Sequence, residues 1–410
     1  MNSFTCLTQA ARITSRSIKP RAFSLPLCIL RRTLFNRPNS LEPSKKKPKM
    51  PLLLLDFDGT ITCTDTLHAL ICLSIARTTS ASPHSDQCQQ TTSPLLPDCM
   101  SELKTTSQKR PNTAALFSLW DDIVREYVAA HTAHSAQYRP REEDRREIDD
   151  EFDYLESVKP IEKASVARVG AAGFFAGLVS WEEAKYESVE GVETRKWGLR
   201  DLGRSAVLHS KDTNVPPDGG GELCVEVRKG FGEFMKRFGG TNTDDWEVAV
   251  VSVNWSAEFI RGVVEGSIGL ERGAFKNRVI ANEVSLPSGE VKGPAELGGD
   301  VLVSVKDKLR AMKSVMKLDG KERVVYFGDS TTDLACLLAA DLGVVVADNT
   351  ETKLMKTLRR MRFKVPHVGE RADRGKLFWA RDFSEVIESK ILERTGVLQG
   401  SPHGSDGASS

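Results

Sequence analysis

The most constraining feature of this sequence is a short apolar run that ends abruptly in two acidic residues. Residues 51–55 are all apolar, and Asp56-Phe57-Asp58-Gly59-Thr60 follows directly. A strand that is apolar on both faces is typical of the centre of a parallel sheet. Its carboxyl end is where open α/β sheets bind their ligands. Because burial and mutual repulsion raise the pKa of at least one carboxyl group, the pair indicates a metal site or a nucleophile beside an acid–base group. The alternative is an Asp pair that caps a helix or forms a turn.

Three later stretches repeat the pattern of an apolar run that passes into a polar turn. These are residues 246–252, 323–329 and 341–348, and helical patterns lie between or beside them at residues 255–265, 306–317 and 332–340. Alternation of strands and helices favours parallel strand pairing. We therefore predict an α/β fold whose core is a Rossmann-like parallel sheet.

A long insertion separates the first two strands, whose ends are 196 residues apart, at positions 56 and 252. One crossover connection does not need that length, so we assign residues 50–75 and 222–395 to the core and residues 76–221 to an inserted, mostly helical cap domain. Helical patterns in the cap cover residues 114–131, 142–158, 161–178 and 181–189. Residues 78–112, rich in Ser, Thr, Gln and Pro, are predicted to be a disordered insertion, and residues 212–221 a linker.

Charge is distributed unevenly along the chain. Residues 139–153 carry many charges of both signs, which predicts a solvated helix face with pairs at i,i+4. Residues 1–41 contain no Asp or Glu among several Arg and many Ser and Thr, a composition typical of a mitochondrial transit peptide. We therefore expect residues 1–49 to be an N-terminal extension, with a mitochondrial location. If translation starts at Met50, a cytoplasmic location is expected instead. Residues 396–410, rich in Gly and Ser, are predicted to be a disordered tail.

Composition excludes several classes of partner and of site. The formal net charge is +1, so no excess of one sign attracts nucleic acid or an anionic membrane surface. No apolar run in the sequence approaches the roughly 18 residues of a membrane-spanning helix. Eight cysteines lie scattered without a Cys-x-x-Cys pair, which favours free thiols over a disulfide framework or a zinc site. We therefore expect neither nucleic acid nor a membrane as a partner, and nothing here predicts the oligomeric state.

Further polar residues stand at the ends of the other predicted strands. Ser252 ends the second strand, Lys308 lies early in a helical pattern, and Gly328-Asp329-Ser330-Thr331-Thr332-Asp333 follows the third strand. Transfer of a phosphoryl group needs a nucleophile, positive charge, a hydroxyl or amide donor, and a divalent ion on oxygen ligands. Asp56, Lys308, Ser252 and Asp329 supply these in turn, although each residue alone is a common turn, cap or surface residue.

As a set, these motifs resemble those of the haloacid dehalogenase superfamily. The resemblance covers the core, while the cap is similar only in its place between the first two motifs, as in the phosphoserine phosphatase branch. The whole chain looks most like fungal members of that branch. The resemblance implies that Asp56 attacks phosphorus and forms an aspartyl phosphate. It implies that Asp58 protonates the leaving oxygen and later activates water.

The same resemblance implies the remaining site residues. Ser252 and Lys308 would bind the transferring phosphoryl oxygens. Mg²⁺ would be held by Asp56, Asp329 and the backbone carbonyl of Asp58, with Asp333 supporting the metal site. Substrate contacts are expected from the residues beside these motifs, namely Gly59, Asp65, Val253 and Asn254.

Two departures from the pattern of the phosphoserine phosphatase branch bear on the identity of the substrate, and the identity of the motif lysine is a separate question. Phosphoserine phosphatases usually have two glycines after the motif-two Ser and a Glu about nine residues after the nucleophile, where this chain has Val253-Asn254 and Asp65. Phosphoserine is therefore not expected as the substrate, and Asp65 is either a leaving-group contact or the N-cap of the next helix. Lys306 competes with Lys308 for the motif lysine. We favour Lys308 because Asp307-Lys308-Leu309 better matches the start of the helix in the family pattern.

The expected function is a Mg²⁺-dependent phosphatase that hydrolyses a small phosphorylated metabolite through an aspartyl-phosphate intermediate. Members that break carbon–halogen bonds lack an acid–base Asp at the position of Asp58, which argues against a dehalogenase. The alternative is a non-catalytic member that binds a phosphorylated ligand or a protein partner.

Overall fold

The computed structural model describes residues 51–79, 113–180, 183–184, 186–189, 192–195, 197–210, 224–239, 246–316, 323–370 and 375–395. The extension at 1–49, the linker at 212–221, the tail at 396–410 and all but the first two residues of the insertion at 78–112 lie outside this part of the chain. Within the described residues, no helix is both long and apolar enough to cross a bilayer.

A six-stranded parallel sheet forms the core, as the sequence predicts. Its order is β10-β9-β8-β1-β4-β5, and every neighbouring pair is parallel. The strands are β1 (Leu52–Leu55), β4 (Glu247–Val251), β5 (Arg278–Ile280), β8 (Val324–Gly328), β9 (Leu342–Val346) and β10 (Leu377–Ala380). The fully buried β1 lies at the centre between β4 and β8, which explains why it is apolar on both faces. The α/β prediction is confirmed.

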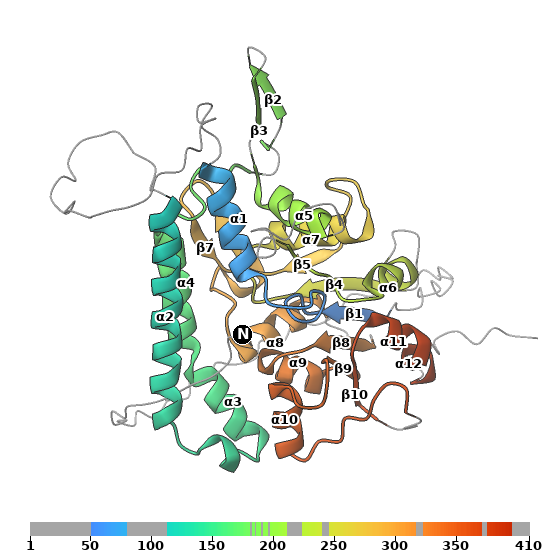
Figure 1. The fold of residues 1–410 in the computed structure, drawn as a ribbon. Coiled ribbons are helices and arrows are strands. Elements are labelled where there is room, and N and C mark those ends of the chain that lie inside the picture. Colours follow the sequence, from blue (N-terminus) through green and yellow to red (C-terminus); the bar gives the residue numbers. More distant parts are fainter. Residues whose placement is uncertain are drawn as a thin grey trace, which may run out of the picture.

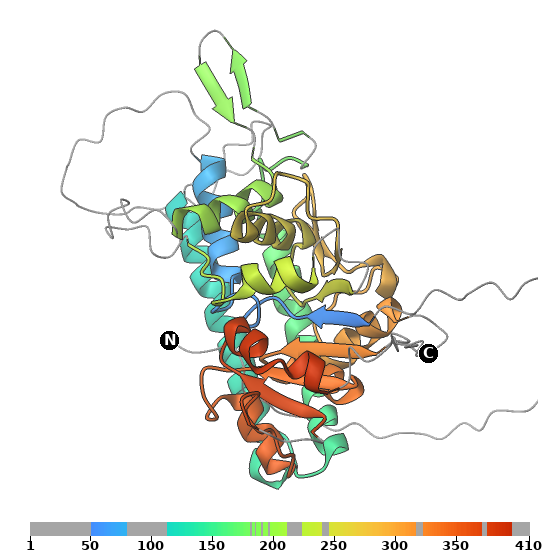
Figure 2. The same cartoon turned by 90° about the vertical axis from the view of Figure 1, so that its right-hand side faces the viewer.

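Helices cover both faces of this sheet, so the core has three layers (Figures 1 and 2). Leu53 and Leu55 share a cluster with α6 (Phe231–Phe238), α7 (Ala257–Ile268) and α11 (Phe383–Ser389), to which α12 (Ile391–Arg394) also contributes. Leu52 and Leu54 share the other cluster with α8 (Val305–Val315), α9 (Leu334–Ala339) and α10 (Lys353–Arg360). Alternate residues of one strand thus fill two separate cores.

The two edge strands of the sheet and a small hairpin that follows β5 were not predicted. β5 has three residues and β10 has four, so neither shows enough of a pattern to be recognised in the sequence. The hairpin pairs β6 (Glu283–Ser285) with β7 (Glu290–Lys292), also three residues each. Three or four residues are too few to show the period-2 alternation of a strand. Strands this short are stabilised by pairing with their neighbours.

Helix α1 (Leu67–Thr79) begins within the predicted core range and runs into the start of the insertion. The described part of the insertion then continues with helices, although their bounds differ from the predicted ones. They are α2 (Thr113–Gln137), the short 3₁₀ helix η1 (Glu142–Asp144), α3 (Ile148–Ser157) and α4 (Lys159–Ala171). α2 and α4 lie side by side at one side of the sheet (Figure 1). The helix predicted over residues 142–158 is therefore split in two. The one predicted to end at residue 178 ends at Ala171, before a run of turns that includes Gly173 at a φ of 74°.

The helix predicted over residues 181–189 is wrong. Residues Tyr186–Val189 form β2, which pairs antiparallel with β3 (Val192–Arg195) in a hairpin that stands away from the sheet (Figures 1 and 2). Within residues 181–189 the β-branched residue is Val189 alone, so the stretch has little of the alternation that marks a strand. The residues that favour extended backbone, Val192 and Thr194, lie in the partner strand.

Helix α5 (Leu199–Ser210) falls within the predicted cap range but packs on the core helix α7. Glycines make this contact close. A Cβ at Gly203 would lie 2.2 Å from the carbonyl oxygen of Phe259, and one at Gly262 would lie 2.0 Å from that of Arg200. The two helices therefore approach so closely that neither glycine position has room for a side chain.

The prediction that residues 139–153 form a solvated face is wrong for two of its charges. Arg145 and Glu151 are buried, and the Arg145 Nε donates to Glu151 Oε2 at 2.7 Å. Arg360 of α10 donates to the same oxygen at 2.5 Å and to Glu142 Oε1 at 3.1 Å. Arg360 lies more than 200 positions from its two acidic partners in the sequence, so spacing along one helix could not reveal these contacts. The ion pairs connect the cap to the core.

Candidate active site

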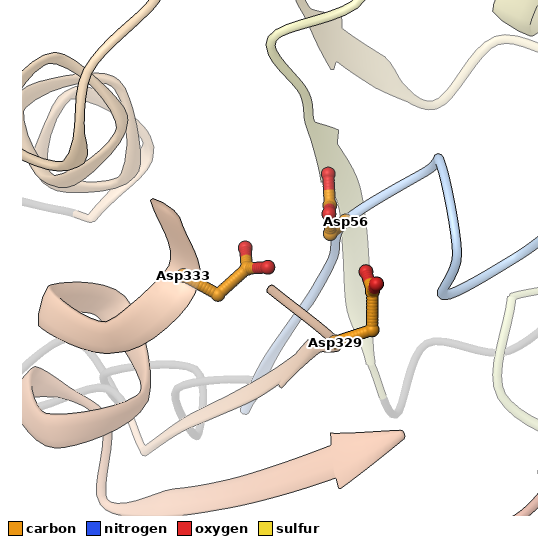
Figure 3. A group of neighbouring side chains, drawn as sticks. All are labelled: Asp56, Asp329 and Asp333. Carbon is orange, nitrogen blue, oxygen red and sulfur yellow. The ribbon is translucent and has the colours of Figure 1, made fainter. Parts of the chain in front are cut away.

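Three carboxylates meet at the carboxyl edge of the central strands (Figure 3). Asp56 follows β1, Asp329 follows β8, and Asp333 lies in the 3₁₀ helix η4 (Thr331–Asp333) that comes next. One oxygen atom from each of the three lies within 4.8 Å of the others. The parallel register aligns β1 with β8, and this brings sequence motifs more than 270 positions apart to one place.

Gly59 gives Asp329 the space it occupies. Its φ is 75°, and a Cβ there would lie 2.2 Å from Asp329 Oδ2. Glycine adopts this left-handed conformation without strain. The neighbouring Thr60 hydroxyl donates to Asp329 Oδ1 at 3.0 Å. Gly59 was predicted to contact substrate, and the structure gives it a steric task beside the carboxylate cluster.

Lys308 is the lysine at this cluster. Ser304 caps the amino end of α8 by accepting a hydrogen bond from the Asp307 N–H, and Lys308 follows in the first turn. The Lys308 Nζ lies 2.7 Å from Asp56 Oδ1 and 2.7 Å from Asp333 Oδ1, and the side chain is fully buried. Lys306, the competing lysine, is 53% exposed and lies 3.8 Å from Asp153.

The electrostatics of the cluster leave room for a cation. Burial, together with the charge of Asp333, raises the pKa of Asp56 well above its usual value despite the opposing effect of Lys308. The same two causes raise the pKa of Asp329 to about 7. Burial alone would lower the pKa of Lys308, but Asp333 and Asp56 raise it, so the ammonium stays charged. Lys308 contacts two of the three acidic groups, Asp56 and Asp333, and hard oxygen ligands of the kind this cluster offers fit Mg²⁺.

Asp333 is held rigidly by neighbours of its own. The Tyr326 hydroxyl donates to Asp333 Oδ1 at 2.7 Å, while the N–H and the hydroxyl of Ser330 donate to Oδ2 at 3.0 and 2.9 Å. With Lys308 also on Oδ1, both oxygens already have partners. Asp333 therefore contacts Lys308 with one oxygen and has partners within the protein on both.

Asp58 belongs to a different environment, although it is only two residues from Asp56. Its Oδ1 accepts from the Thr66 N–H at 2.9 Å and from the Thr66 hydroxyl at 2.7 Å. Its Oδ2 accepts from Asn254 Nδ2 at 2.8 Å. Burial raises the pKa of Asp58, and these three donors oppose that rise. The Asp58 side chain is not part of the three-carboxylate cluster, which consists of Asp56, Asp329 and Asp333.

The three residues that follow β4 have partners within the protein, and one of them, Asn254, contacts Asp58. Asn254 is fully buried, its Nδ2 also donates to Thr66 Oγ1 at 3.1 Å, and its Oδ1 accepts from the Ser256 N–H at 3.1 Å. Ser252 is buried and accepts from the Asn254 N–H at 3.1 Å, and the half-buried Val253 packs on the cluster that contains α8. Asn254 was predicted to contact substrate, and in the structure its amide contacts Asp58 and Thr66.

Asp65 lies at the boundary between core and cap. Its Oδ1 accepts from the Leu67 N–H at 2.8 Å, and the Thr66 carbonyl between them accepts the first helical hydrogen bond of α1, from the Leu70 N–H at 2.9 Å. Asp65 therefore bonds the first N–H of the helix from one position before the N-cap. Asp65 is exposed to solvent, and the charges of Asp58 and Glu162 act to raise the pKa of its carboxyl group. Glu162 of α4 accepts from the Tyr127 hydroxyl at 2.8 Å and lies 2.9 Å from His131 Nε2.

Sequence reasoning missed these cap residues, and it also missed Thr66. A Tyr, a His and a Glu spaced along amphipathic helices give no signal, because such residues are common on solvated faces. Thr66 could have been suspected, since Thr64-Asp65-Thr66 precedes a helix and offers hydroxyl donors close to Asp58.

Comparison with known proteins gives few close matches. No family model matches the chain. The mitochondrial bifunctional TH2 protein of Arabidopsis thaliana is 26% identical over 216 residues, which is 50% of this chain and 28% of that protein. The chain thus spans less than a third of the length of this curated relative.

Solved structures with a similar arrangement share little sequence with the chain. A phospho-aspartyl intermediate analogue of phosphoserine phosphatase is 14% identical, with 83% of this chain and 98% of that chain covered and a TM-score of 0.34. A phosphoserine phosphohydrolase-like protein from Francisella tularensis is 12% identical, with 83% and 99% covered and a TM-score of 0.34. A Bordetella pertussis protein of unknown function is 12% identical, with 77% and 96% covered and a TM-score of 0.38. The fold assignment rests on the strand order and not on these likenesses.

Proposed function

We propose that the protein is a Mg²⁺-dependent phosphatase that hydrolyses a small phosphorylated metabolite through an aspartyl phosphate on Asp56. The observation that carries this proposal is the unequal environment of two aspartates at one strand end. Asp56 contacts the Lys308 ammonium in a cluster of acids, whereas Asp58 is held by neutral donors. Two carboxyl groups with separate environments suit a nucleophile and an acid–base group.

The first half-reaction uses both aspartates. An oxygen of Asp56 attacks phosphorus, the bond from phosphorus to the ester oxygen breaks, and Asp58 gives its proton to that leaving oxygen. Lys308, which lies 2.7 Å from Asp56, would neutralise charge that develops on the phosphoryl oxygens, and the Ser252 hydroxyl would donate to one of them. A raised pKa of Asp58 supports its role as the acid.

The second half-reaction restores the enzyme. Asp58, now a carboxylate, takes a proton from water as the water oxygen attacks phosphorus, and the bond from phosphorus to Asp56 breaks. Orthophosphate leaves, and Asp58 is protonated again. Asn254 and Thr66 fix the carboxyl group of Asp58 through both steps.

The acids would hold Mg²⁺ through Asp56, Asp329 and the backbone carbonyl of Asp58, with Asp333 behind them. When bound, Mg²⁺ neutralises charge on the transferring phosphoryl group. The raised pKa values of Asp56 and Asp329 support this assignment. They indicate that the cationic side chains nearby do not balance the negative charge of these carboxylates, which a bound cation would do.

We further propose that the substrate's alcohol carries positive charge or several hydrogen-bond donors. Glu162 accepts from the Tyr127 hydroxyl and lies 2.9 Å from His131 Nε2, and the two rings lie 4.6 Å apart. The charges of Glu162 and Asp58 both act to raise the pKa of Asp65. Carboxylates beside aromatic rings favour cationic groups. Amino alcohol phosphates should then be hydrolysed faster than neutral phosphates of equal size. A preference for an acidic alcohol such as phosphoglycolate would contradict this substrate class.

The proposal is tested with a panel of phosphomonoesters in Mg²⁺ and in EDTA, with para-nitrophenyl phosphate as a generic aryl ester. We expect turnover that depends on Mg²⁺ and is lost in Asp56→Asn. No turnover of any ester, together with a cellular phenotype that survives Asp56→Asn, would favour the alternative of a non-catalytic binding module.

A further inference from the structure

The cap touches the core at the first turn of the helix that carries Lys308. Glu156, near the end of α3, accepts a hydrogen bond from the Lys306 N–H at 2.8 Å through its Oε1. The Lys159 Nζ, at the start of α4, lies 2.6 Å from Asp307 Oδ1. Residues 156–159, the α3–α4 corner, thus contact the two residues that directly precede Lys308.

Asp307 depends on this cap lysine for its charge balance. Its side chain is 1% exposed, and its Oδ2 has no hydrogen-bond partner among the described residues. Among the described residues, the other cation within 4.0 Å of the Asp307 carboxylate is Arg310, on the same helix. Its Nη1 lies 3.6 Å from Asp307 Oδ1, and its side chain is 55% exposed. A buried carboxylate that loses its close partner is destabilised, so the first turn of α8 responds to whether Lys159 is in place.

The corner also has apolar and ionic support. Tyr154 and Leu155 of α3 belong to the same buried cluster as Val305 of α8. Farther along, Arg360 of α10 binds Glu151 and Glu142 from the cap. The corner is therefore a docked interface, with Glu156 and Lys159 at the part nearest Lys308.

From these contacts we infer that Glu156 and Lys159 are positioning residues that hold the first turn of α8 so that Lys308 stands between Asp56 and Asp333. Lys308 Nζ contacts both carboxylates at 2.7 Å. A helix turn moves as a unit, so displacement of Asp307 displaces Lys308. This inference rests on the proposed function for the claim that Lys308 binds the phosphoryl group. It gives the cap a role in the active site, namely to hold Lys308 in the position from which it binds the phosphoryl group.

The test compares Lys159→Met with a matched control, Lys163→Met. Lys163 lies one turn along the same helix and pairs with Asp300 at 3.7 Å, away from α8. The full chain is used, and binding of orthophosphate is measured by calorimetry in Mg²⁺, beside turnover of para-nitrophenyl phosphate. For Lys159→Met we expect the orthophosphate Kd to rise and kcat/KM to fall by about tenfold. Lys163→Met should equal the parent, and Lys159→Arg should recover most of the loss.

Hydrogen exchange provides a readout that does not depend on activity. Glu156→Ala removes the acceptor of the Lys306 N–H, so the amides of the first turn of α8 should exchange faster while those of α7 stay unchanged. This arm also covers the case in which Lys159→Met does not fold. If the parent neither binds orthophosphate nor turns over esters, the proposed function fails while the exchange result still tests the inference. Exchange and orthophosphate binding equal to the parent in both variants would overturn it.

Discussion

Asn254→Ala is the most informative perturbation of the site, because Asn254 touches Asp58 without touching the carboxylate cluster. Its amide donates to Asp58 Oδ2 at 2.8 Å and is, after burial, the leading influence on the pKa of Asp58, which it lowers. Removing a donor that favours the carboxylate makes the proton harder to lose. The pKa of Asp58 should therefore rise. The carboxyl group should stay protonated to higher pH, and the carboxylate that acts as the base should form only above that pH.

The magnitude follows from the strength of the bond. A hydrogen bond to a charged group contributes about 1.5–3 kcal/mol, and about 1.36 kcal/mol corresponds to a tenfold change in a proton equilibrium. Because the two Thr66 donors stay on Oδ1, we take the lower end, which displaces the titration upward by about 1 pH unit.

Turnover of para-nitrophenyl phosphate isolates the step concerned. Its acidic phenol leaves without a proton from Asp58, so hydrolysis of the phosphoenzyme limits turnover and needs Asp58 as a base. The rise of kcat with pH should move upward in Asn254→Ala by about 1 pH unit. Thr66→Ser, which keeps the hydroxyl, is the matched control and should show no displacement. A lower plateau at an unchanged midpoint would refute the positioning role of Asn254.

Four further outcomes are expected. Asp56→Asn should form no phosphoenzyme, as measured by mass spectrometry after acid quench. A phosphorylated Asp56→Asn protein would refute the assignment of Asp56 as the nucleophile. Asp58→Asn should lose about 10²–10⁴ in rate on alkyl phosphates but keep a burst with the aryl ester in rapid-quench experiments, whereas equal impairment of both would contradict its role. In EDTA, the melting temperature should fall as pH rises from 3.8 to about 7, because the unfolded chain releases the proton that burial keeps on Asp329 until its raised pKa is passed. Addition of Mg²⁺ should raise the melting temperature more above pH 7 than below pH 3.8. An equal rise at both pH values would argue against Asp329 as a ligand of Mg²⁺. Gly203→Ala should destabilise by about 1–3 kcal/mol in denaturant titrations, while Gly232→Ala, with open space in α6, should stabilise the fold slightly.

The parallel core could be predicted because its signals are local. The apolar runs of β1, β4, β8 and β9 each end at a polar turn, and buried parallel strands require that pattern. The edge strands β5 and β10 could not be found, because strands this short are specified by pairing with a neighbour. The helix predicted over residues 181–189 was wrong for the same reason, because the strand Tyr186–Val189 depends on pairing with Val192–Arg195.

The site shows the same division between local and distant information. Asp56, Asp329 and Asp333 stand in motifs at strand ends, so topology alone brings them together. The task of Asn254 could not be read from the sequence, because it depends on a contact with Asp58 across 196 positions. The buried pair of Arg145 with Glu151 escaped for a similar reason, since a charged run looks solvated until its distant partner is known.

The close contact between α5 and α7 limits how the chain can be shortened. Deletion of everything from residue 76 to residue 221 would also remove α5, and the backbone groove at Gly262 and Gly266 would then face water. The buried Glu265 would lose the Arg200 guanidinium, whose Nη2 donates to its Oε1 at 2.5 Å. A minimal core that folds must therefore keep residues 199–210 and rejoin them to the end of α1 by a short linker. Cap exchange between related chains has its natural junction before Leu199.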